Sequence, residues 1–543
     1  MPPTLASSPR SLRVLSGPIG LVAGGALLCA GLGEGCGSNK ATQGTTGFSG
    51  SAAAGSASGT GGQGGNIFTF TSSSMGSGGT MSSGSGGSKP VCDGNPTKGT
   101  QKWAEKNDDD GNQYALGVAS DAAGNVYVTG SYSGSFTLGG KTADVTGATN
   151  ALFVAKLSAD GTVAWAHGYA AAKTGVPNPL VTGRGVAVDA QGNVYVAGDF
   201  TGNATFGGVS MTSAGNFFGD SFLLKLSAAG DVVNALRLGD PASTPASGGN
   251  AQTTRAVTVS GARVAVVGDA AGTFDIGGGK TVTGGGTAGA FLAVFGTDLT
   301  PQFVTLLSDG TVPQSTHAVA YDAAGDLVIT GNTTGPITFP GGAAMMPAGT
   351  QSTFLAKIAG DGSATTWAKL FGAGTSGGEG VAIAPGGDIF LTGDHKGVMD
   401  FGGGGMIDNK YGANVFVAKL DPMGGHLWSY SFGDSQAQHA LGIGVDAMGR
   451  AVLVGQYAGK IDFGGGALTS AGGDDAFVAK LDTHGCQVWA KSFGDAAEQT
   501  ASGVVVNATG DAVVTGSLAG VVSFGATVLT AQGTDAFVAR FAP

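Results

Sequence analysis

The stretch Asp121–Gly130, D-A-A-G-N-V-Y-V-T-G, decides the fold, because closely similar stretches return along the whole chain. The next copy, D-A-Q-G-N-V-Y-V-A-G, occupies residues 189–198. If the final glycine is taken as a marker, the pattern recurs every 61 to 70 residues. The marker glycines are Gly130, Gly198, Gly268, Gly331, Gly393, Gly455 and Gly516. Self-similarity at such a period predicts a stack or ring of repeated supersecondary units.

Each repeat holds four short apolar runs separated by turn residues. In the first repeat they are the run before Asp121 and the segments 125–130, 152–157 and 162–167. Runs of β-branched and aromatic residues bounded by Gly, Asn and Asp predict strands. Between the first two runs, Asp121 can close an Asx-turn and Gly124 tolerates a positive φ, so this segment predicts a hairpin.

Aromatic residues follow the same period. All five tryptophans occupy one position of the repeat, and fourteen of the 27 phenylalanines occupy two others. The tryptophans are Trp103, Trp165, Trp367, Trp428 and Trp489. One phenylalanine set lies in segments like F-V-A-K-L, at Phe153, Phe222, Phe291, Phe354, Phe416, Phe477 and Phe537. The other opens turns like F-G-G, at Phe136, Phe206, Phe274, Phe339, Phe401, Phe463 and Phe524.

Four antiparallel strands repeated seven times predict an all-β, seven-bladed β-propeller of four-stranded blades. Segments such as V-Y-V-T-G are apolar on both faces, as expected of strands covered by a blade on each side. The F-V-A-K-L strand keeps one basic position, which we expect to point outward. It holds Lys156, Lys225, Lys357, Lys419, Lys480 and Arg540, and the third repeat departs with Val294.

The two ends of the repeat region predict how the ring closes. After Trp489 the next tryptophan strand would fall beyond Pro543. A lone tryptophan strand, Q-K-W-A-E-K at 101–106, precedes the first complete set of three strands. We expect this N-terminal strand to supply the outer strand of the last blade, which would remove two exposed sheet edges.

The D-x-x-G-N-V-Y-V-T-G, D-A-F-V-A-K-L-D and W-A-K-x-F-G segments resemble the bacterial SBBP repeat over about residues 101–543. The resemblance implies a seven-bladed propeller in a secreted or surface protein. It implies no catalytic residues, since the family has no agreed ones. The third repeat departs most, with Ser260-Gly261-Ala262 at the turn and Phe303 at the tryptophan position.

Composition and charge narrow the classes of function. The chain has 543 residues, 104 of them Gly, and the repeat argues that residues 91–543 are one propeller domain. A net charge of −11 without a basic cluster argues against nucleic-acid binding. We expect no cofactor, because the G-x-G strings lie in turns and not at the start of a helix.

Residues 1–36 are predicted to be an export signal. Arg10 and Arg13 precede the apolar stretch 14–32, and Gly35-Cys36 then resembles a bacterial lipobox. The favoured interpretation is a lipoprotein anchored to a membrane through Cys36, in the cell envelope or on the outer surface. A cleaved signal giving a secreted protein, or an uncleaved anchor, are the alternatives.

Residues 37–90 are almost all Gly, Ser, Thr and Ala, which predicts a disordered tether between the anchor and the propeller. As a Gly/Ser coil its ends would average roughly 40 Å apart. We expect the propeller itself to be a monomer.

Two cysteines lie outside the signal. Cys486 comes three residues before Trp489, and Cys92 comes eleven before Trp103. Because those tryptophans belong to adjacent blades, we expect a disulfide that fixes the N-terminal strand; two separate thiols are the alternative.

Metal sites find little support in the sequence. The acidic run 107–112 lacks ligands at two positions of an EF-hand-like loop, which favours a solvated turn over a calcium site. The six histidines show no spacing typical of zinc ligands.

One set of polar residues predicts a binding site. Arg184, Arg255, His317 and Glu379 lie five residues before the first hairpin turn of four successive repeats. We expect them at the mouth of the central channel, where convergent polar groups mark a binding site and two guanidiniums suit a carboxylate or sulfate. Solvated charges at blade entries are the alternative.

These features favour a non-enzymatic, membrane-tethered binding or scaffolding module that engages a protein, glycan or matrix component. The alternatives are a polysaccharide lyase or hydrolase that uses the same four residues, and a purely structural role in the envelope. Propellers host all of these functions, so the fold alone does not choose between them.

Overall fold

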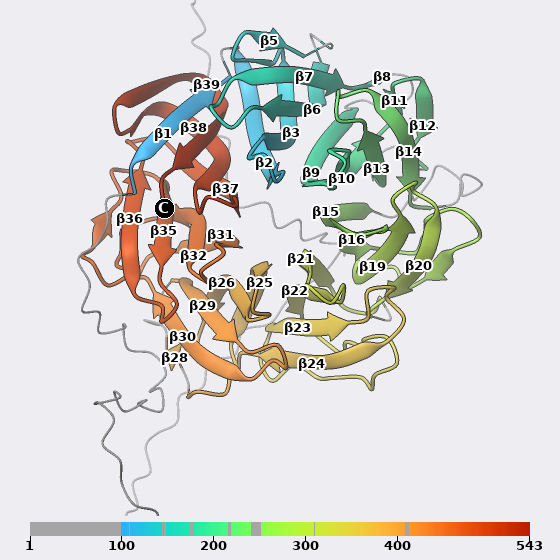
Figure 1. Ribbon diagram of the computed structural model, residues 1–543. Coiled ribbons are helices and arrows are strands. Elements are labelled where there is room, and N and C mark those ends of the chain that lie inside the picture. Colours follow the sequence, from blue (N-terminus) through green and yellow to red (C-terminus); the bar gives the residue numbers. More distant parts are fainter. Residues whose placement is uncertain are drawn as a thin grey trace, which may run out of the picture. The chain divides into compact units, whose positions relative to one another are not determined.

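The described part of the chain contains strands and no helices. The computed structural model describes residues 99–107, 109–143, 145, 148–172, 179–214, 219–240, 251–308, 310–404, 406–407 and 412–543. Within these ranges every regular element is a β-strand, and most strands belong to antiparallel sheets (Figure 1). The expectation of an all-β protein built from four-stranded antiparallel sheets is therefore confirmed.

Five separate sheets of the described chain contain four long strands each, paired in chain order. We call them groups 2 to 6. Group 2 holds β9 (Leu180–Val188), β10 (Val194–Thr201), β13 (Asp220–Leu226) and β14 (Val232–Leu238). Group 3 holds β15 (Gln252–Ser260), β16 (Arg263–Ala270), β19 (Gly289–Gly296) and β20 (Pro301–Leu306). Group 4 holds β21 (Gln314–Tyr321), β22 (Leu327–Thr333), β23 (Ser352–Ile358) and β24 (Thr365–Phe371). Group 5 holds β25 (Thr375–Ile383), β26 (Ile389–Lys396), β29 (Asn414–Leu420) and β30 (His426–Phe432). Group 6 holds β31 (Gln438–Val445), β32 (Ala451–Tyr457), β35 (Asp475–Leu481) and β36 (Gln487–Phe493).

The remaining long strands form one eight-stranded sheet that contains two further sets of four. Group 1 holds β2 (Gly111–Ser120), β3 (Val126–Gly134), β6 (Ala148–Leu157) and β7 (Val163–Tyr169). Group 7 holds β37 (Gln499–Val506), β38 (Ala512–Phe524), β39 (Thr527–Phe541) and β1 (Gln101–Lys106). A short parallel pairing of β2 with β39 joins the two groups. β1 pairs antiparallel with β39, with Trp103 opposite Arg540, and Figure 1 shows the blue β1 beside the red β38 and β39. The N-terminal strand thus pairs with the strand that contains Phe537, as predicted.

Short strands follow the second strand of most groups or extend a group's edge. They are β4 (Thr137–Leu138), β5 (Lys141–Thr142), β8 (Ala171–Ala172), β11 (Asn203–Phe206), β12 (Val209–Thr212), β17 (Thr273–Asp275), β18 (Thr281–Thr283), β27 (Val398–Met399), β28 (Met406–Ile407), β33 (Lys460–Ile461) and β34 (Leu468–Thr469). Each of β4–β5, β11–β12, β17–β18, β27–β28 and β33–β34 is an antiparallel hairpin.

The periodic phenylalanines pair with one another inside each group. The phenylalanine of each F-G-G turn contacts that of the F-V-A-K-L strand in the same repeat, with ring centroids between 4.0 Å (Phe136–Phe153) and 5.6 Å (Phe339–Phe354) apart. The other five pairs fall within this range. Contacts of this kind between aromatic rings contribute about 0.5–1.5 kcal/mol beyond the area they bury, so the period of phenylalanine follows from packing.

The hydrophobic cores lie between neighbouring groups. Phe390 and Val417 of group 5 share one core with Leu453 and Phe477 of group 6. Another core joins strands of group 1 to strands of group 7. Because both faces of a middle strand are covered, β29 is buried along nearly its whole length, which explains why these strands are apolar without alternation.

The tryptophan position contacts the last hairpin turn of the following group. The indole Nε1 of Trp103, Trp367 and Trp428 donates to a turn carbonyl at 3.2, 3.1 and 2.9 Å. The ring also covers a glycine of that turn, on which a Cβ would lie 2.8, 3.1 and 3.3 Å from the ring, respectively. At Trp489 no such turn follows, and Gly99 of the N-terminal segment occupies the equivalent place, where a Cβ would lie 2.5 Å from the ring. We call each of these contacts a tryptophan latch.

At two of the six basic positions of the F-V-A-K-L strand, the side chain does not point outward as predicted. The side chain of Lys480 is fully buried, with its Nζ 3.0 Å from Asp446 Oδ2. Arg540 is also buried and pairs with Asp511 at 2.6 Å. A buried cation requires a paired carboxylate, and each carboxylate comes from the first hairpin turn of the same group.

Candidate functional site

The marker glycine of each repeat creates a bulge in the strand that precedes it. A Cβ on Gly331 would lie 2.0 Å from the carbonyl oxygen of Ser315 and 2.9 Å from the ring of Phe354, so only glycine fits. The other six marker glycines are equally crowded. Opposite each of them, the register of the first strand slips by one residue. Bulges of this kind commonly re-aim one side chain and are frequent at functional sites.

The slipped residue is in every group the position that the sequence singled out. We call these seven residues the bulge set. It consists of Leu116, Arg184, Arg255, His317, Glu379, Leu441 and Ser502. The four residues predicted as a binding site therefore occupy equivalent positions on β9, β15, β21 and β25, in four consecutive groups. Their strands contact one another in that order.

The two arginines of the bulge set are already paired within their own groups. Arg184 pairs with Asp199, and Arg255 Nε lies 2.6 Å from Asp269 Oδ1. Attraction to Asp199 raises the pKa of Arg184, against the opposing effect of burial. Both guanidiniums that we expected to suit a carboxylate or sulfate of a ligand therefore already contact a carboxylate of the protein. About a third of each arginine side chain stays exposed, at 32% and 34%.

His317 and Glu379 are brought together across two groups. Their Nδ1 and Oε2 atoms lie 2.9 Å apart, and 26% of the Glu379 side chain is exposed. Burial alone would raise the pKa of Glu379, but the interactions with His317, then Arg255 and His439, outweigh it and lower the pKa. Arg255, His317 and Glu379 therefore belong to one electrostatic network, with Arg184 in the adjoining group.

A second set of polar residues, not predicted from the sequence, directly follows the marker glycines. Asp199 and Asp269 belong to it, and so do Asp394 and Gln456. Ser315 donates to Asp269 at 2.7 Å, Thr500 donates to Gln456 at 2.7 Å, and His439 Nδ1 lies 3.5 Å from Asp394. In each case a first strand reaches the second strand of the preceding group. The polar residue after each marker glycine was the available signal.

These contacts extend the polar network beyond the four predicted residues. The interaction with Asp394 raises the pKa of His439, and Asp474 and Glu379 add to the shift. Burial raises the pKa of Asp474 despite its attraction to His439. The arrangement is a chain of donors and acceptors across β9, β15, β21, β25 and β31, in which most charges are matched by an opposite charge.

The other predicted sites have different outcomes. Cys36 and Cys92 lie outside the described residues, so lipidation and the Cys92–Cys486 disulfide stay predictions. In the acidic run 107–112, Asp109 accepts hydrogen bonds from Ser135 at 2.9 Å and Thr137 at 3.3 Å, which ties it to the next hairpin.

Across the described ranges, no group of three or more His, Cys, Asp or Glu side chains is placed to hold a metal ion. The same ranges contain no helix able to span a membrane.

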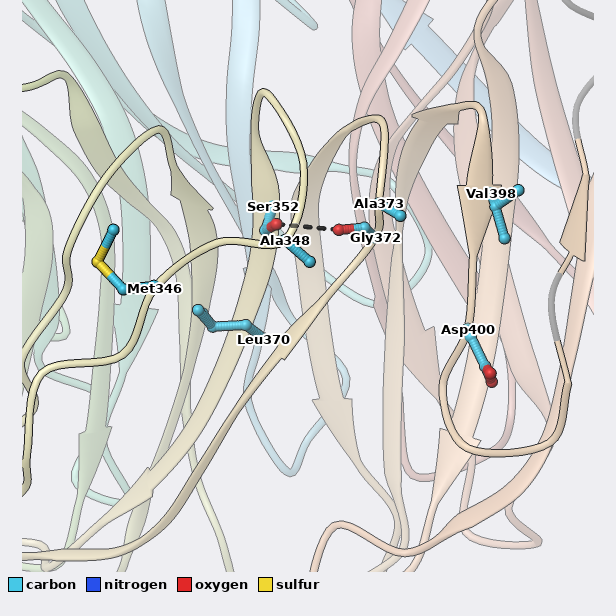
Figure 2. Close-up of a pocket in the computed structure, with 8 residues that line it drawn as sticks. All are labelled: Met346, Ala348, Ser352, Leu370, Gly372, Ala373, Val398 and Asp400. Carbon is cyan, nitrogen blue, oxygen red and sulfur yellow. Dashed lines mark hydrogen bonds between the residues drawn. The ribbon is translucent and has the colours of Figure 1, made fainter.

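Two hollows lie away from the bulge set. One, of about 280 Å³, lies between groups 4 and 5. Figure 2 shows Met346 and Leu370 on one side of it and Val398 and Asp400 on the other, with the Ser352–Gly372 hydrogen bond between them. The second, of about 440 Å³, is lined by residues 260–263 with Gln302, Tyr321 and Gly325. We call it the Arg263 hollow.

Comparison with known families confirms the resemblance seen in the sequence. The model of the SBBP beta-propeller repeat matches residues 173–203, which include β9 and β10. The chain therefore carries an SBBP repeat and has the β-propeller fold. No curated protein sequence matches the chain.

Solved structures similar to this chain have varied functions. Sqt1 from Chaetomium thermophilum is 10% identical, with 80% of this chain and all of that chain covered and a TM-score of 0.37. A europium-containing methanol dehydrogenase is 11% identical, with 75% and 90% covered and a TM-score of 0.33. A puromycin hydrolase is 13% identical, with 76% of this chain and 54% of that chain covered and a TM-score of 0.34. At these values the likeness says nothing about substrate or partner.

Proposed function

We propose that this chain is a seven-bladed, extracytoplasmic β-propeller that acts as a non-enzymatic binding module. Its ligand is held by the four charged or titratable members of the bulge set, Arg184, Arg255, His317 and Glu379. In this proposal groups 1 to 7 are the blades, β1 closes the ring, and the bulge set surrounds one mouth of the central channel. The ligand is a protein, a glycan or a matrix component. The observation that carries the binding role is the polar network that joins four consecutive bulge residues.

The contacts between first strands support a closed ring. β2 contacts β9, and the series continues through β15, β21, β25, β31 and β37, which contacts β2 again. The tryptophan latches run in the same cyclic order. They pass from Trp103 of group 7 to the turn of group 1, and finally from Trp489 of group 6 to Gly99, which precedes β1 of group 7.

The exposure and chemistry of the network support a ligand rich in both donors and acceptors. Between a quarter and a third of the Arg184, Arg255 and Glu379 side chains is open, while their partners fix their orientation. Preorganised pairs of guanidinium and carboxylate lose little entropy on binding and present hydrogen-bond groups of both kinds. Sugar hydroxyls and peptide groups fit such a surface better than an isolated anion does.

Binding assays of the full chain against arrayed glycans and envelope extracts test this role. Glu379→Gln should weaken binding of any captured ligand at least about tenfold, because a desolvated charged hydrogen bond is lost. Ser502→Ala alters the bulge set outside the polar network and should leave binding unchanged. If neither the glycan array nor the envelope extract yields a ligand, or if both variants bind like the wild type, this role for the bulge set is wrong.

We also propose that residues 1–36 direct export, that Cys36 is lipidated, and that residues 37–90 tether the propeller to the membrane. The support is the charged and apolar leader followed by Gly35-Cys36. Lipidated protein should partition with membranes and lose this on Cys36→Ala. Mass spectrometry of the mature N-terminus decides the matter, and an unmodified terminus elsewhere would make the protein a secreted one.

A disulfide between Cys92 and Cys486 fits the same arrangement. Gly99 lies on the ring of Trp489, and Cys486 ends the turn that leads into β36, with its N–H donating to Asp482 at 2.9 Å. Six residues separate Cys92 from Gly99, enough chain to reach this turn. Thiol titration of the unreduced, denatured protein should find neither thiol reactive; two reactive thiols would contradict the bridge.

The contact between His317 and Glu379 favours one alternative, a polysaccharide lyase or hydrolase. A histidine and a carboxylate at 2.9 Å can act as a general base and its orienting partner. Turnover of acidic or neutral polysaccharides by the wild type, abolished by His317→Ala, would support the enzyme and overturn the non-enzymatic proposal.

A further inference from the structure

The first hairpin turn of group 3 is shorter than those of the other groups. In group 1 the turn spans Asp121 to Asn125, and the N–H of Asp121 donates to the carbonyl of Asn125 at 3.1 Å. In group 3 only Gly261 and Ala262 separate the paired residues Ser260 and Arg263. The turn of group 3 is thus one residue shorter than the turn of group 1. The Arg263 hollow lies between this shorter turn and Tyr321 of group 4.

Two arginines occupy the same place in groups 3 and 6, directly before the apolar part of the second strand. In group 6, Arg450 Nε donates to Asp446 Oδ2 at 2.7 Å, and the N–H of Arg450 donates to the same carboxylate at 2.9 Å. In group 3 the position of Asp446 is held by Ser260, which has no carboxylate. Among the described residues, no ion pair or hydrogen bond engages the guanidinium of the exposed Arg263.

In group 6 the carboxylate of Asp446 has a second partner, Lys480, and group 3 has no equivalent of this lysine. Lys480 pairs with Asp446 at 3.0 Å, whereas the equivalent residue of group 3 is Val294. Group 3 has therefore lost the turn carboxylate and the buried lysine but keeps the arginine. An arginine left without its intramolecular carboxylate can take one from a ligand, in the planar two-point geometry that guanidinium favours.

The surroundings of Arg263 add further unengaged polar groups. Ser260 and Gln302 line the hollow, and no hydrogen bond of their side chains is made within the described ranges. Tyr321 donates to the carbonyl of Gly360 at 3.3 Å, which leaves its partly exposed ring as one wall. Asp361 is the nearby acidic group. It accepts hydrogen bonds from both the N–H and the hydroxyl of Ser363, which lower its pKa, and Arg263 lowers it further through longer-range attraction without a hydrogen bond.

We propose that the Arg263 hollow binds an acidic saccharide, a uronate unit. The carboxylate of the uronate pairs with Arg263 and takes the place of the internal carboxylate that group 3 lacks. Ser260 and Gln302 supply hydrogen bonds to the sugar hydroxyls, and the ring of Tyr321 packs against the sugar face. A hollow with one cation, two small polar groups and one aromatic wall fits a uronate better than a bare anion. The site is separate from the bulge set and does not depend on binding there.

Calorimetry of the full chain with trigalacturonate tests the proposal. The wild type should bind, and Arg263→Gln should lose binding at least about tenfold, as expected for removal of a charged hydrogen bond. Ser260→Asp should lose it to a similar degree, because it restores the internal carboxylate seen in group 6. Arg450→Gln is the matched control and should bind like the wild type.

Two comparisons identify the recognised group. Trigalacturonate methyl ester, which lacks the charge, should bind at least about tenfold more weakly than the acid. A glutamate tripeptide of equal charge should also bind more weakly, because it offers no hydroxyls to Ser260 and Gln302. No binding of trigalacturonate to the wild type, equal binding by Ser260→Asp, or stronger binding of the peptide would each overturn the proposal. Arg263 and Ser260 are not core residues, and unchanged thermal unfolding of the variants checks that they fold.

Discussion

Groups 6 and 7 contain the same four-stranded sheet but are built in different ways. Group 6 is continuous from β31 to β36, and a hairpin turn joins its third and fourth strands. In group 7 the fourth strand, β1, comes from the other end of the repeat region. No covalent turn holds β1 against β39, so backbone pairing and side-chain contacts must do so.

The contacts of β1 show what replaces the turn. Lys102 Nζ lies 2.8 Å from Asp511, and Lys106 Nζ lies 3.0 Å from Asp535; both carboxylates are fully buried. The N–H of Ala536 donates to the side chain of the buried Asn107 at 2.7 Å. In group 6 the fourth strand makes one contact of this kind, because the hydroxyl of Ser492 on β36 donates to the buried Asp475 at 3.2 Å. Group 7 differs in that β1, which no turn holds, forms ion pairs with two buried carboxylates.

The largest effect is expected from removing the joining strand. Deletion of residues 91–106 should abolish cooperative unfolding and give aggregated protein, because β39 becomes an open edge and Trp489 loses its cover. Deletion of residues 37–90 is the control and should leave the melting temperature of the soluble protein unchanged. A soluble, cooperatively folded 91–106 deletion would show that β1 is dispensable and break the comparison.

The second largest effect is expected from removing the carboxylate of Asp511 in group 7. Asp511 pairs with both Lys102 and Arg540, and Asp511→Ala leaves the buried Arg540 without its partner, at a cost of about 3–5 kcal/mol. Asp388 holds the equivalent turn position in group 5, but its side chain is 31% exposed where it pairs with Lys419. Asp388→Ala should therefore cost under about 1 kcal/mol. Urea unfolding measures both, and equal losses would show that burial of the pair does not matter.

The tryptophan latch at Gly99 can be compared directly with the latch at Gly485, where the glycine belongs to a hairpin turn. A Cβ would lie 2.5 Å from Trp489 at Gly99 and 2.3 Å from Tyr430 at Gly485, while at Gly449 it would lie 3.8 Å from Thr483; all three have positive φ. Positive φ alone costs an alanine about 1–2 kcal/mol, and the crowding adds about 1–3 kcal/mol. Gly99→Ala should thus destabilise the protein as much as Gly485→Ala and more than Gly449→Ala. A Gly99→Ala variant no worse than Gly449→Ala would mean that the N-terminal segment is latched loosely.

Much of this arrangement could be predicted from the sequence, because it repeats. The strands, the paired phenylalanines and the place of β1 follow from periodic apolar residues and from the count of tryptophan strands. The bulge positions of Arg184 and Glu379 could be located by their distance from the turn, although the bulge itself depends on close contacts of the marker glycine that only the structure shows.

Pairing of charges was beyond the sequence. Asp269 meets Arg255 because a one-residue slip in the register brings them together, and the slip leaves no sign in composition. Lys480 was expected to point outward because lysine is rarely buried, yet Asp446 lies beside it in the folded turn. Contacts between distant segments, such as His317 with Glu379, depend on how neighbouring groups pack.

The smallest expected effect is a shared dependence of groups 6 and 7 on pH. Burial opposes ionisation of Asp446 and Asp511, but backbone hydrogen bonds and Arg450 and Lys480 at the first, and Lys102 and Arg540 at the second, lower each pKa below the ordinary 3.8. A carboxyl whose pKa is lowered by folding stabilises the folded state above its unfolded pKa, and this contribution disappears as the pH falls through the folded pKa.

The wild type should therefore lose stability as the pH falls below about 4, at about 1.4 kcal/mol for each unit of pKa difference. Asp511→Asn and Asp446→Asn should each be less stable than the wild type near neutral pH, and the difference should shrink in acid. Urea midpoints near pH 7 and near pH 3 measure this effect. If the gap between Asp511→Asn and the wild type stays constant with pH, Asp511 contributes through its shape and hydrogen bonds and not through its charge. The polar contacts that hold β1 would then have to be sought at Asp535 and Asn107.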